Sequence, residues 1–377
     1  RPVAYVGGGA ILSNAAVELH EFIKKTGIPI TTTLMALGAY PQDEPENLFM
    51  LGMHGTRYAN YAVQECDLLL AIGARFDDRV TGKLEDFAPN ATIVHVDIDP
   101  TSIAKNVNVE IPVVGDVKNV LQKLNKLVER PEIGAWLQKI EEWKQQYPLT
   151  YKPRQGVIAP QEVLLTIDRL TRGKAIIATD VGQHQMWSAQ FLRFTRPRTW
   201  LSSGGLGTMG FGLPAAIGAQ AAFPDELVIS INGDGGFQMM AQELTTASIN
   251  KLPVVSVILN NMYLGMVRQW QELFYDRNYA MTCLDRKVDC LAQCSNPDRG
   301  VCPTYVPDFV KLAEACNCVG MRVTESAQIE PALRRAIEIA RSERRPSVVE
   351  FIIVREENVY PMVPAGASLN QMLDSLA

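Results

Sequence analysis

The chain has 377 residues, which favours two domains, and its 47% hydrophobic and 20% charged residues are ordinary for a globular protein. The formal net charge of −5, without a lysine- or arginine-rich tract, argues against nucleic acid or an anionic membrane as a partner. No apolar run approaches the roughly 20 residues of a membrane span.

The chain opens inside a strand-like run, "RPVAYVGGG", without an initiator Met or a signal-peptide layout. This start predicts a piece of a longer chain. With no targeting segment, the simplest compartment is the cytosol, where the seven cysteines would stay reduced.

The first half alternates short apolar runs with helical patterns. Val3–Val6 reads as a strand and is followed by three glycines. Ser13 is the candidate cap of a helix that carries Ala16, Leu19 and Ile23 and ends at Gly27. The further elements are strands at 28–33, 68–72, 93–98 and 111–114, and helices around 120–128 and 133–146. Strands separated by helices predict a parallel, doubly wound α/β domain over residues 1–146.

A stretch with three prolines and no helical period, residues 147–160, predicts a linker. The same alternation then resumes over 161–354. Its strand candidates are 175–179, 199–201, 227–231, 254–259, 319–323 and 348–354. Residues 355–377 hold too many turn formers to continue a sheet. The prediction is two tandem doubly wound parallel-sheet domains and a C-terminal tail.

Polar residues follow two strands of the second domain. "SINGDGGFQMMAQ" places Asp234 among glycines after one strand, and the next strand ends in Asn260-Asn261. With helix 238–250 as a right-handed crossover, both strand ends share one sheet edge. Carboxylate and amide oxygens suit Mg²⁺, and glycines admit a bulky anion. Alone, the Asp reads more often as a helix cap. Paired with Asn261, 27 residues on, it predicts a metal–diphosphate site.

This pairing resembles the GDG…NN signature of thiamine-diphosphate enzymes. The resemblance implies that Asp234, Asn261 and the main-chain oxygen of Tyr263 bind the metal. Two further segments, "TDVGQHQMW" and "GGLGTMGFGLPAAIGA", are similar to the family's other cofactor loops. They imply cofactor contacts for Gly182, Gln183, His184, Gly207, Gly233, Gly235 and Gly236, and a cofactor-bending role for Met209. Without the family, Met209 reads as core packing and His184 as a surface histidine.

Within that family the chain resembles the catalytic subunits of acetolactate (acetohydroxyacid) synthases. The similar segments are "HGTRYANYAVQECDLLLAIGARFDDRVTG", "NNMYLGMVRQWQELFY" and "ENVYPMVPAGASLNQM". The resemblance implies a central domain that holds FAD as a structural ligand. The implied contacts are Gly7, Gly8, Thr33, Leu34, Met53, His54, Gly55, Gly73, Arg75, Asp97 and Asp116. A sheet that has lost its flavin is the alternative.

The resemblance implies decarboxylation of pyruvate and ligation to pyruvate or 2-ketobutyrate, the first common step of branched-chain amino-acid synthesis. Arg79 is the candidate for the second substrate's carboxylate, and Trp270 and Met266 for its selection. The plainer interpretations are a surface ion pair for Arg79 and helix packing for Trp270. The family also implies a homodimer or tetramer and a possible small regulatory subunit.

Two features depart from the family. Its members carry a pyrimidine-binding domain before the FAD domain, with the glutamate that activates the cofactor, so we expect these 377 residues alone to form no acetolactate. Residues 283–305 form an insert with four cysteines, at spacings that match no standard zinc or cluster motif. The rival functions are another thiamine-dependent 2-ketoacid lyase or oxidase, and a non-catalytic fragment that binds FAD and thiamine diphosphate.

Overall fold

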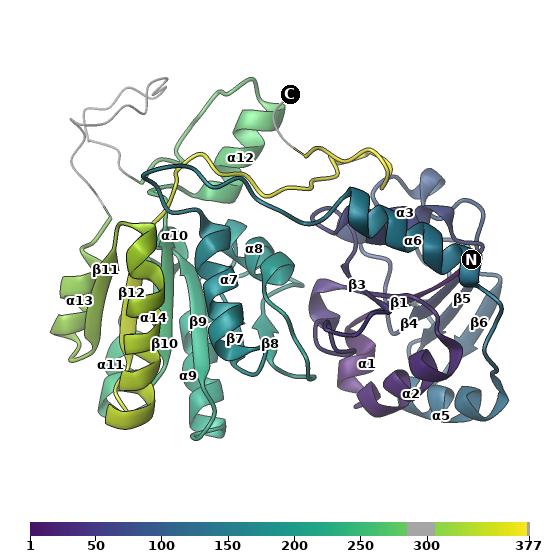
Figure 1. The fold of residues 1–377 in the computed structure, drawn as a ribbon, viewed down its shortest axis with the longest axis horizontal. Coiled ribbons are helices and arrows are strands. Elements are labelled where there is room, and N and C mark those ends of the chain that lie inside the picture. Colours follow the sequence, from purple (N-terminus) through teal and green to yellow (C-terminus); the bar gives the residue numbers. More distant parts are fainter. Residues whose placement is uncertain (285–305, 375–377) are drawn as a thin grey trace. The chain divides into compact units, whose positions relative to one another are not determined.

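The computed structural model describes residues 1–284 and 306–374. The chain divides into two compact units, shown as ribbons in Figure 1. Unit 1 comprises Arg1–Thr150, Arg193–Arg198 and the stretch from Tyr360 onward, and unit 2 comprises Tyr151–Leu192 and Thr199–Val359. Each unit is a parallel-sheet α/β domain, as predicted.

Unit 1 is built on a six-stranded parallel sheet in the order β3-β2-β1-β4-β5-β6. Its strands are β1 Pro2–Val6, β2 Ile30–Thr32, β3 Asn47–Met50, β4 Leu68–Ile72, β5 Thr92–Asp97 and β6 Ile111–Val114. Its helices are α1 Gly8–Leu12, α2 Ala16–Thr26, α3 Arg57–Glu65, α4 Asp78–Thr81, α5 Val117–Leu127 and α6 Gly134–Gln146, with 3₁₀ turns at Leu34–Ala36 and Leu84–Asp86.

Helices cover both faces of this sheet (Figure 1), although the edge strand β6 stays largely exposed. Alternate residues of β1 divide between two cores: Val3 and Tyr5 pack with α3 and α6, whereas Ala4 and Val6 pack with α1, α2 and α5. A strand buried on both faces reads as a continuous apolar run, which is why β1 and β4 were predictable from the sequence.

The prediction that Ser13 caps the following helix is wrong. Ser13 ends α1, and α2 begins at Ala16 with no side-chain hydrogen bond at its N-cap, Ala15. The glycine-rich turn after β1 opens directly into α1, which the sequence analysis had not assigned. The predicted helix end is confirmed, since Gly27 has φ 69° and donates its N–H to Ile23 O.

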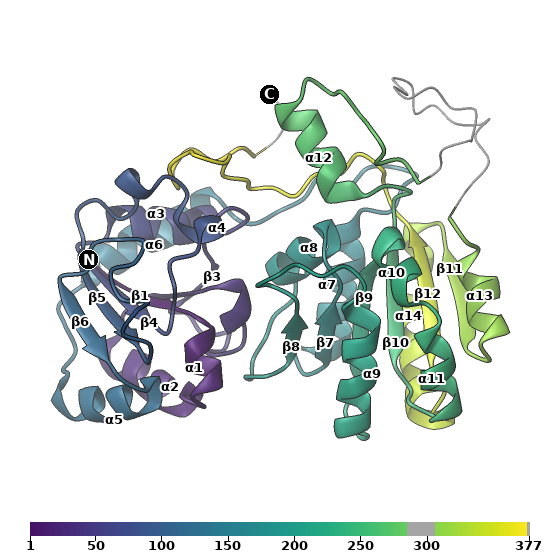
Figure 2. The same cartoon turned by 180° about the vertical axis from the view of Figure 1, so that it is seen from behind.

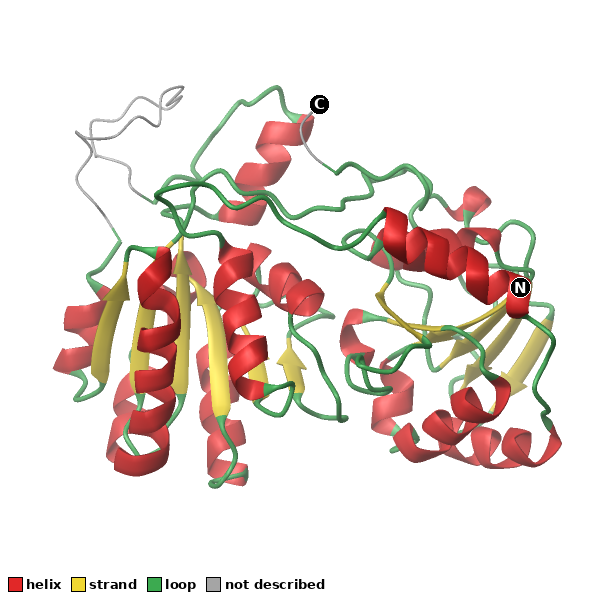
Figure 3. Ribbon diagram, in the orientation of Figure 1, coloured by secondary structure: helices red, strands yellow, loops and turns green. Residues whose placement is uncertain are grey.

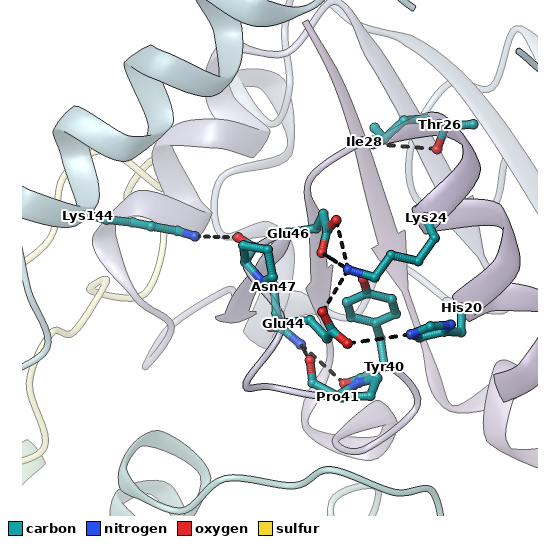
Figure 4. A network of polar contacts seen from close by, with 11 residues as sticks. His20, Lys24, Thr26, Ile28, Tyr40, Pro41, Glu44, Glu46, Asn47 and Lys144 are labelled. Carbon is teal, nitrogen blue, oxygen red and sulfur yellow. Dashed lines mark hydrogen bonds and ion pairs between the residues drawn. The ribbon is translucent and has the colours of Figure 1, made fainter. Parts of the chain in front are cut away.

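Strand β3 escaped prediction because its four residues carry no clear pattern. A polar network holds the segment that leads into it (Figure 4). Lys24 Nζ on α2 donates to Glu44 Oε2 at 2.7 Å and Glu46 Oε2 at 2.9 Å, and Tyr40 Oη donates to Glu46 Oε2 at 2.8 Å. Long-range contacts of this kind, rather than local propensity, place β3 at the sheet edge.

Unit 2 has a second six-stranded parallel sheet, in the order β11-β12-β10-β9-β7-β8. Its strands are β7 Ile176–Thr179, β8 Trp200–Ser202, β9 Val228–Gly233, β10 Val255–Asn260, β11 Val319–Val323 and β12 Ser347–Ile352. Its helices are α7 Pro160–Thr171, α8 Gln183–Phe191, α9 Gly212–Ala222, α10 Asp234–Met240, α11 Glu243–Ile249, α12 Gly265–Phe274, α13 Phe309–Ala315 and α14 Ile329–Glu338, with a 3₁₀ turn at Ser326–Gln328 and a π-helical turn at Ile339–Glu343.

Helices cover both faces of this sheet as well. Helices α7 and α14 lie on the face turned toward the viewer in Figure 1, and α9, α10 and α11 on the face seen from behind in Figure 2. The helix predicted at 238–250 is instead two helices. Helix α10 starts at Asp234, directly after β9, and α11 follows a break at Ala241-Gln242. Leu244 and Ala247 of α11 are buried.

The stretch after β12, residues 353–374, contains no helix and adds no strand to either sheet (Figure 3). Its later part packs into unit 1: Val363 N donates to Met53 O at 2.8 Å, and Lys83 N donates to Ala367 O at 3.0 Å. Val363, Leu369 and Met372 join the core beneath α3. No helix within the described part of the chain is both long enough and apolar enough to cross a bilayer.

Candidate functional site

A cavity of about 470 Å³, open to solvent, lies at the carboxyl ends of the central strands of unit 2. Strands β9 and β10 are parallel neighbours with Leu259 opposite Gly233, so their ends are level. This confirms that Asp234 and the asparagine pair share one sheet edge. The predicted residues that line the cavity are Gly182, Gln183, His184, Met209, Gly233, Asp234, Gly235, Gly236, Asn261, Tyr263 and Met266.

Asp234 is the first residue of α10 and is 1% exposed. Its Oδ1 accepts a hydrogen bond from Gly235 N at 3.0 Å, whereas Oδ2 has no hydrogen-bond partner among the described residues. Burial raises the pKa of this carboxyl from 3.8 to about 7. A buried carboxylate oxygen without a partner is costly, and a bound cation would relieve that cost.

Asn261 begins the turn after β10 and is also buried. Its Oδ1 accepts from Tyr263 N at 3.0 Å, and its Nδ2 donates to Gln183 Oε1 at 3.3 Å. An amide oxygen has two lone pairs, so Oδ1 keeps one for a cation. Asp234, Asn261 and Tyr263 therefore offer the hard oxygen donors that Mg²⁺ binds.

The loop after β7 supplies a second wall. His184 is 6% exposed, which overturns its interpretation as a surface histidine. Its Nε2 has no hydrogen-bond partner among the described residues, and burial lowers its pKa. A Cβ on Gly233 would lie 2.9 Å from His184 Nδ1, so this wall needs glycine at the end of β9. Met209 lines the cavity half-buried, rather than in the core.

Helix α12 is fastened to this wall through two amides. Gln183 Nε2 donates to Gln269 Oε1 and to Glu357 O, each at 2.9 Å. A Cβ on Gly265 would overlap Gln183 Oε1. The helix brings Met266 to the cavity. Gly207 and Trp270 are not among the cavity's lining residues; Gly207 is exposed with φ 75°, and Trp270 is half-buried one turn beyond Met266.

In unit 1 the predicted flavin residues lie at or just after the ends of five strands that are neighbours in the sheet, in the order β2, β1, β4, β5, β6. These residues are Gly7, Gly8, Thr33, Leu34, Gly73, Arg75, Asp97 and Asp116. A Cβ on Gly7 would overlap Gly73 O, so close approach of the β1 and β4 turns already requires that glycine. Asp116 accepts from Asn119 N at 3.0 Å and caps α5, and Arg75 pairs with Asp77.

A second cavity, of about 400 Å³, lies within unit 1. It is lined by Met53, Asp78, Arg79, Gly82, Leu369 and residues 363–366. The Arg79 side chain is 58% exposed, and its Nη1 is 3.4 Å from Asp78 Oδ2. His54, beside Met53, is buried with Nδ1 3.4 Å from Pro361 O, and burial lowers its pKa to about 4. Gly55 folds back so closely that a Cβ would overlap the Leu51 backbone.

Comparison with known proteins assigns both units. Residues 180–351 match the family model described as thiamine pyrophosphate enzyme, C-terminal TPP binding domain. Residues 1–124 match the thiamine pyrophosphate enzyme, central domain. The chain belongs to the thiamine pyrophosphate enzymes.

Acetolactate synthases are among its relatives. The chain is 47% identical over 379 residues to acetolactate synthase 1, chloroplastic, of Zea mays, covering 99% of this chain and 57% of that protein. It is 48% identical to acetolactate synthase, chloroplastic, of Arabidopsis thaliana and 46% identical to the acetolactate synthase large subunit of Corynebacterium glutamicum, of which it covers 54% and 57%. The chain thus spans about half the length of the curated relatives it matches.

The cavity of unit 2 fits the diphosphate end of the cofactor that gives this family its name. Two buried polar atoms there, Asp234 Oδ2 and His184 Nε2, lack hydrogen-bond partners within residues 1–284 and 306–374. The carboxylate suits a divalent cation, and the imidazole suits an anionic oxygen. Groups of three or more His, Cys, Asp or Glu side chains placed to hold a metal ion do not occur in the described chain, so this mixed set of carboxylate, amide and carbonyl oxygens is the candidate.

Asp180, which follows β7 and is fully buried, was not predicted as a site residue. Its Oδ1 accepts from Gly210 N at 2.7 Å, and its Oδ2 lies where a Cβ of Gly236 would be. Asp180 thereby holds the loop that carries Met209 and fills the space beside Gly236 in α10, where its Oδ2 has no hydrogen-bond partner among the described residues. The rule that identified Asp234, a carboxylate directly after a strand, applies equally to Asp180. Residues 285–305 of the cysteine insert lie outside the described residues. That the cysteines there stay reduced therefore remains a prediction.

Proposed function

We propose that these residues form the FAD-binding and thiamine-diphosphate-binding parts of an acetolactate synthase catalytic subunit. The observation that carries the proposal is the unpartnered, buried Asp234 Oδ2, which stands level with Asn261 in a cavity of a thiamine pyrophosphate enzyme. The acetolactate synthase names of the relatives supply the reaction. Two 2-ketoacids, pyruvate with pyruvate or with 2-ketobutyrate, are the proposed substrates.

In this proposal Asp234, Asn261 and the Tyr263 carbonyl hold Mg²⁺, which in turn holds the diphosphate. Gly182, Gln183, His184, Gly207 and the backbone at Gly233, Gly235 and Gly236 contact the phosphates. Met209 keeps the cofactor bent. When bound, thiamine diphosphate supplies the carbon nucleophile and the electron sink for loss of carbon dioxide. The protein's own work is to bind, orient and exclude water.

Selection of the second ketoacid is assigned to Met266 and Trp270 on α12. Met266 lines the cavity, and Trp270 lies one turn further along the helix. Arg79 is proposed to bind the second carboxylate, because a planar guanidinium pairs with it bidentately. Its large exposed fraction leaves the guanidinium accessible to a substrate.

FAD is proposed as a structural ligand of unit 1, across the neighbouring strand ends that carry Gly7, Gly8, Thr33, Leu34, Gly73, Arg75, Asp97 and Asp116, with Met53, His54 and Gly55 as a second contact. Small residues and carboxylates at consecutive strand ends suit an extended dinucleotide. A homodimer or tetramer, a small regulatory subunit and a cytosolic location remain predictions from the sequence, and the plant relatives are named chloroplastic.

The experiment is cofactor binding by the 377-residue chain. Thiamine diphosphate is titrated calorimetrically with and without Mg²⁺, against the wild type and Asp234→Asn. We expect binding only with Mg²⁺, and a loss in Asp234→Asn that exceeds the roughly 10- to 100-fold typical of outer-shell metal variants. Metal-independent binding, or an unaffected Asp234→Asn variant, would overturn the assignment of the metal site.

The reaction itself is assayed with the same residues joined behind the pyrimidine-binding domain that the family resemblance implies. Pyruvate consumption is followed together with acetolactate and peroxide. Acetolactate without peroxide supports the synthase, and peroxide release identifies a flavin-dependent oxidase instead. The 377 residues alone are the comparison arm, in which no acetolactate is expected.

A further inference from the structure

The asparagine that precedes the proposed metal ligand is itself held by a buried network. Asn260 ends β10 and is fully buried. Its Oδ1 accepts from Met262 N at 3.0 Å, and its Nδ2 donates to Glu350 Oε1 at 2.7 Å. Met262 has φ 60°, a backbone conformation that non-glycine residues rarely adopt. The Asn260 side chain therefore stabilises the strained turn that carries Asn261 and Tyr263.

Glu350 lies on β12, the strand next to β10, and is 2% exposed. Its two oxygens have different partners. Oε1 accepts from Asn260, and Oε2 accepts from Arg322 Nε at 2.7 Å on β11. Arg322 Nη2 in turn donates to Asp308 Oδ1 at 2.8 Å. A chain of hydrogen bonds thus runs from β11 through β12 to β10 and ends at the turn Asn261–Tyr263, which carries the proposed metal ligands.

This arrangement fixes which way the Asn260 amide points. An ionised carboxylate only accepts hydrogen bonds, so the Asn260 amide must turn its NH₂ toward Glu350. Its oxygen then faces Met262 N–H. With the amide reversed, NH₂ would oppose N–H at the turn and oxygen would oppose oxygen at Glu350. The ion pair with Arg322, whose side chain is 41% exposed, would by itself need neither Asn260 nor this orientation.

We propose that Glu350 is a positioning residue for the metal site, and that it acts through Asn260 on the Asn261–Tyr263 turn. The inference rests on the proposed function, in which Asn261 and the Tyr263 carbonyl hold Mg²⁺. Partners that orient metal ligands without touching the metal commonly set its affinity. The Glu350 oxygens bond to Asn260 and Arg322, so any positioning effect passes through the turn. Besides burial, the charge of Glu350 also raises the pKa of Asp234 directly, and a variant pair that keeps the net charge separates the two effects.

The test inverts donor and acceptor across one hydrogen bond. The probe is Mn²⁺ with thiamine diphosphate, and its Kd is measured by electron paramagnetic resonance for the 377-residue chain. The variants are Glu350→Gln, Asn260→Asp and the double variant. In the double variant the new amide at position 350 can donate to the new carboxylate at position 260 and still accept from Arg322. The new carboxylate keeps an oxygen to accept from Met262 N.

Loss of an outer-shell partner typically costs 10- to 100-fold, so we expect each single variant to weaken Mn²⁺ about tenfold or more and the double variant to return within about threefold of wild type. Asn260→Asp adds a negative charge near the cation, and this charge alone would strengthen Mn²⁺ binding. Weaker binding by this variant would therefore reflect lost positioning of the turn. Val349→Ala is the control for lost stability, because it leaves a cavity at a buried residue of the same strand and does not change Asn260. This variant should bind Mn²⁺ as the wild type does.

The inference is overturned if the single variants bind Mn²⁺ as wild type does, if the double variant is no tighter than the singles, or if Val349→Ala loses as much affinity. A single variant that does not fold leaves the double variant as the deciding measurement. If the wild-type chain binds no Mn²⁺ with thiamine diphosphate, the metal site of the proposed function is wrong, and this inference fails with it.

Discussion

His54 is a buried imidazole whose surroundings favour the neutral form. Burial is the main cause of its lowered pKa, about 4 against an ordinary 6.5, and the charge of Arg79 lowers it further. A weak contact of Nδ1 with Pro361 O, at 3.4 Å, only partly opposes these effects. Protonation of His54 is therefore coupled to the packing of the C-terminal stretch on unit 1.

This coupling predicts an acid-sensitive unit 1. Below pH 6.5 the unfolded chain binds a proton at His54 that the folded chain binds only near pH 4, so the free energy of unfolding falls over this interval, by up to about 3 kcal/mol from this residue. Urea unfolding between pH 4 and 7 should show a shallower pH slope for His54→Asn than for wild type. His20→Asn, at a partly exposed histidine, is the control. Equal slopes in wild type and His54→Asn would contradict the prediction.

The sequence reveals site residues best where a strand end supplies the rule. Asp234 and Asn261 were predictable because consecutive parallel strands joined by a helix present their carboxyl ends together. Glu350 lies inside β12, in an otherwise apolar run, and its partners Asn260 and Arg322 are far away in sequence. Such a network appears only once the strand order is known. Arg79 and Trp270 were named by resemblance, since no local pattern separates them from an ordinary ion pair or helix packing.

At the scale of an element, α10 shows how one side chain decides where a helix begins. The sequence pattern predicted a start at residue 238, whereas the helix starts at Asp234, with no interval after β9. The start is possible because Gly236 leaves room for the Asp180 carboxylate, which a Cβ there would overlap. Periodicity shows the buried face of a helix but not the space that a neighbouring loop needs at its first turn.

Gly236→Ala should therefore displace either Asp180 or the first turn of α10. We expect a lower Tm and loss of Mg²⁺-dependent thiamine-diphosphate binding, measured by calorimetry. The matched control is Gly218→Ala in α9, where nothing lies within 4 Å of the new Cβ. That variant should be neutral or more stable by about 0.5–1 kcal/mol, because alanine is the better helix former. Similar behaviour of the two variants would show that Gly236 is not needed for space.

For the whole molecule, the path of the chain matters more than its local patterns. The chain passes from unit 1 to unit 2 at residue 151, returns for residues 193–198, and returns again from Tyr360. No sequence signal marks these returns, because the returning segments have neither helical nor strand period. Their packing is specified by distant partners, as with Val363 N and Met53 O. Unit 1 can therefore complete its core only after the stretch from Tyr360 has been made.

Leu369→Ala tests this dependence of unit 1 on the end of the chain. Leu369 is 1% exposed within the core that also holds Leu48 and Tyr58. Truncating a buried leucine typically costs about 2–5 kcal/mol, so unit 1 should lose that much stability while unit 2 keeps its own. Hydrogen exchange read by region should become faster in β1, β4 and α3 and stay unchanged in β9 and β10. Leu12→Ala, at a leucine that is 79% exposed, should change neither region. Leu369 does not belong to the core of unit 2. Equally faster exchange in β9 and β10 would therefore contradict the prediction and mean that the two units unfold together.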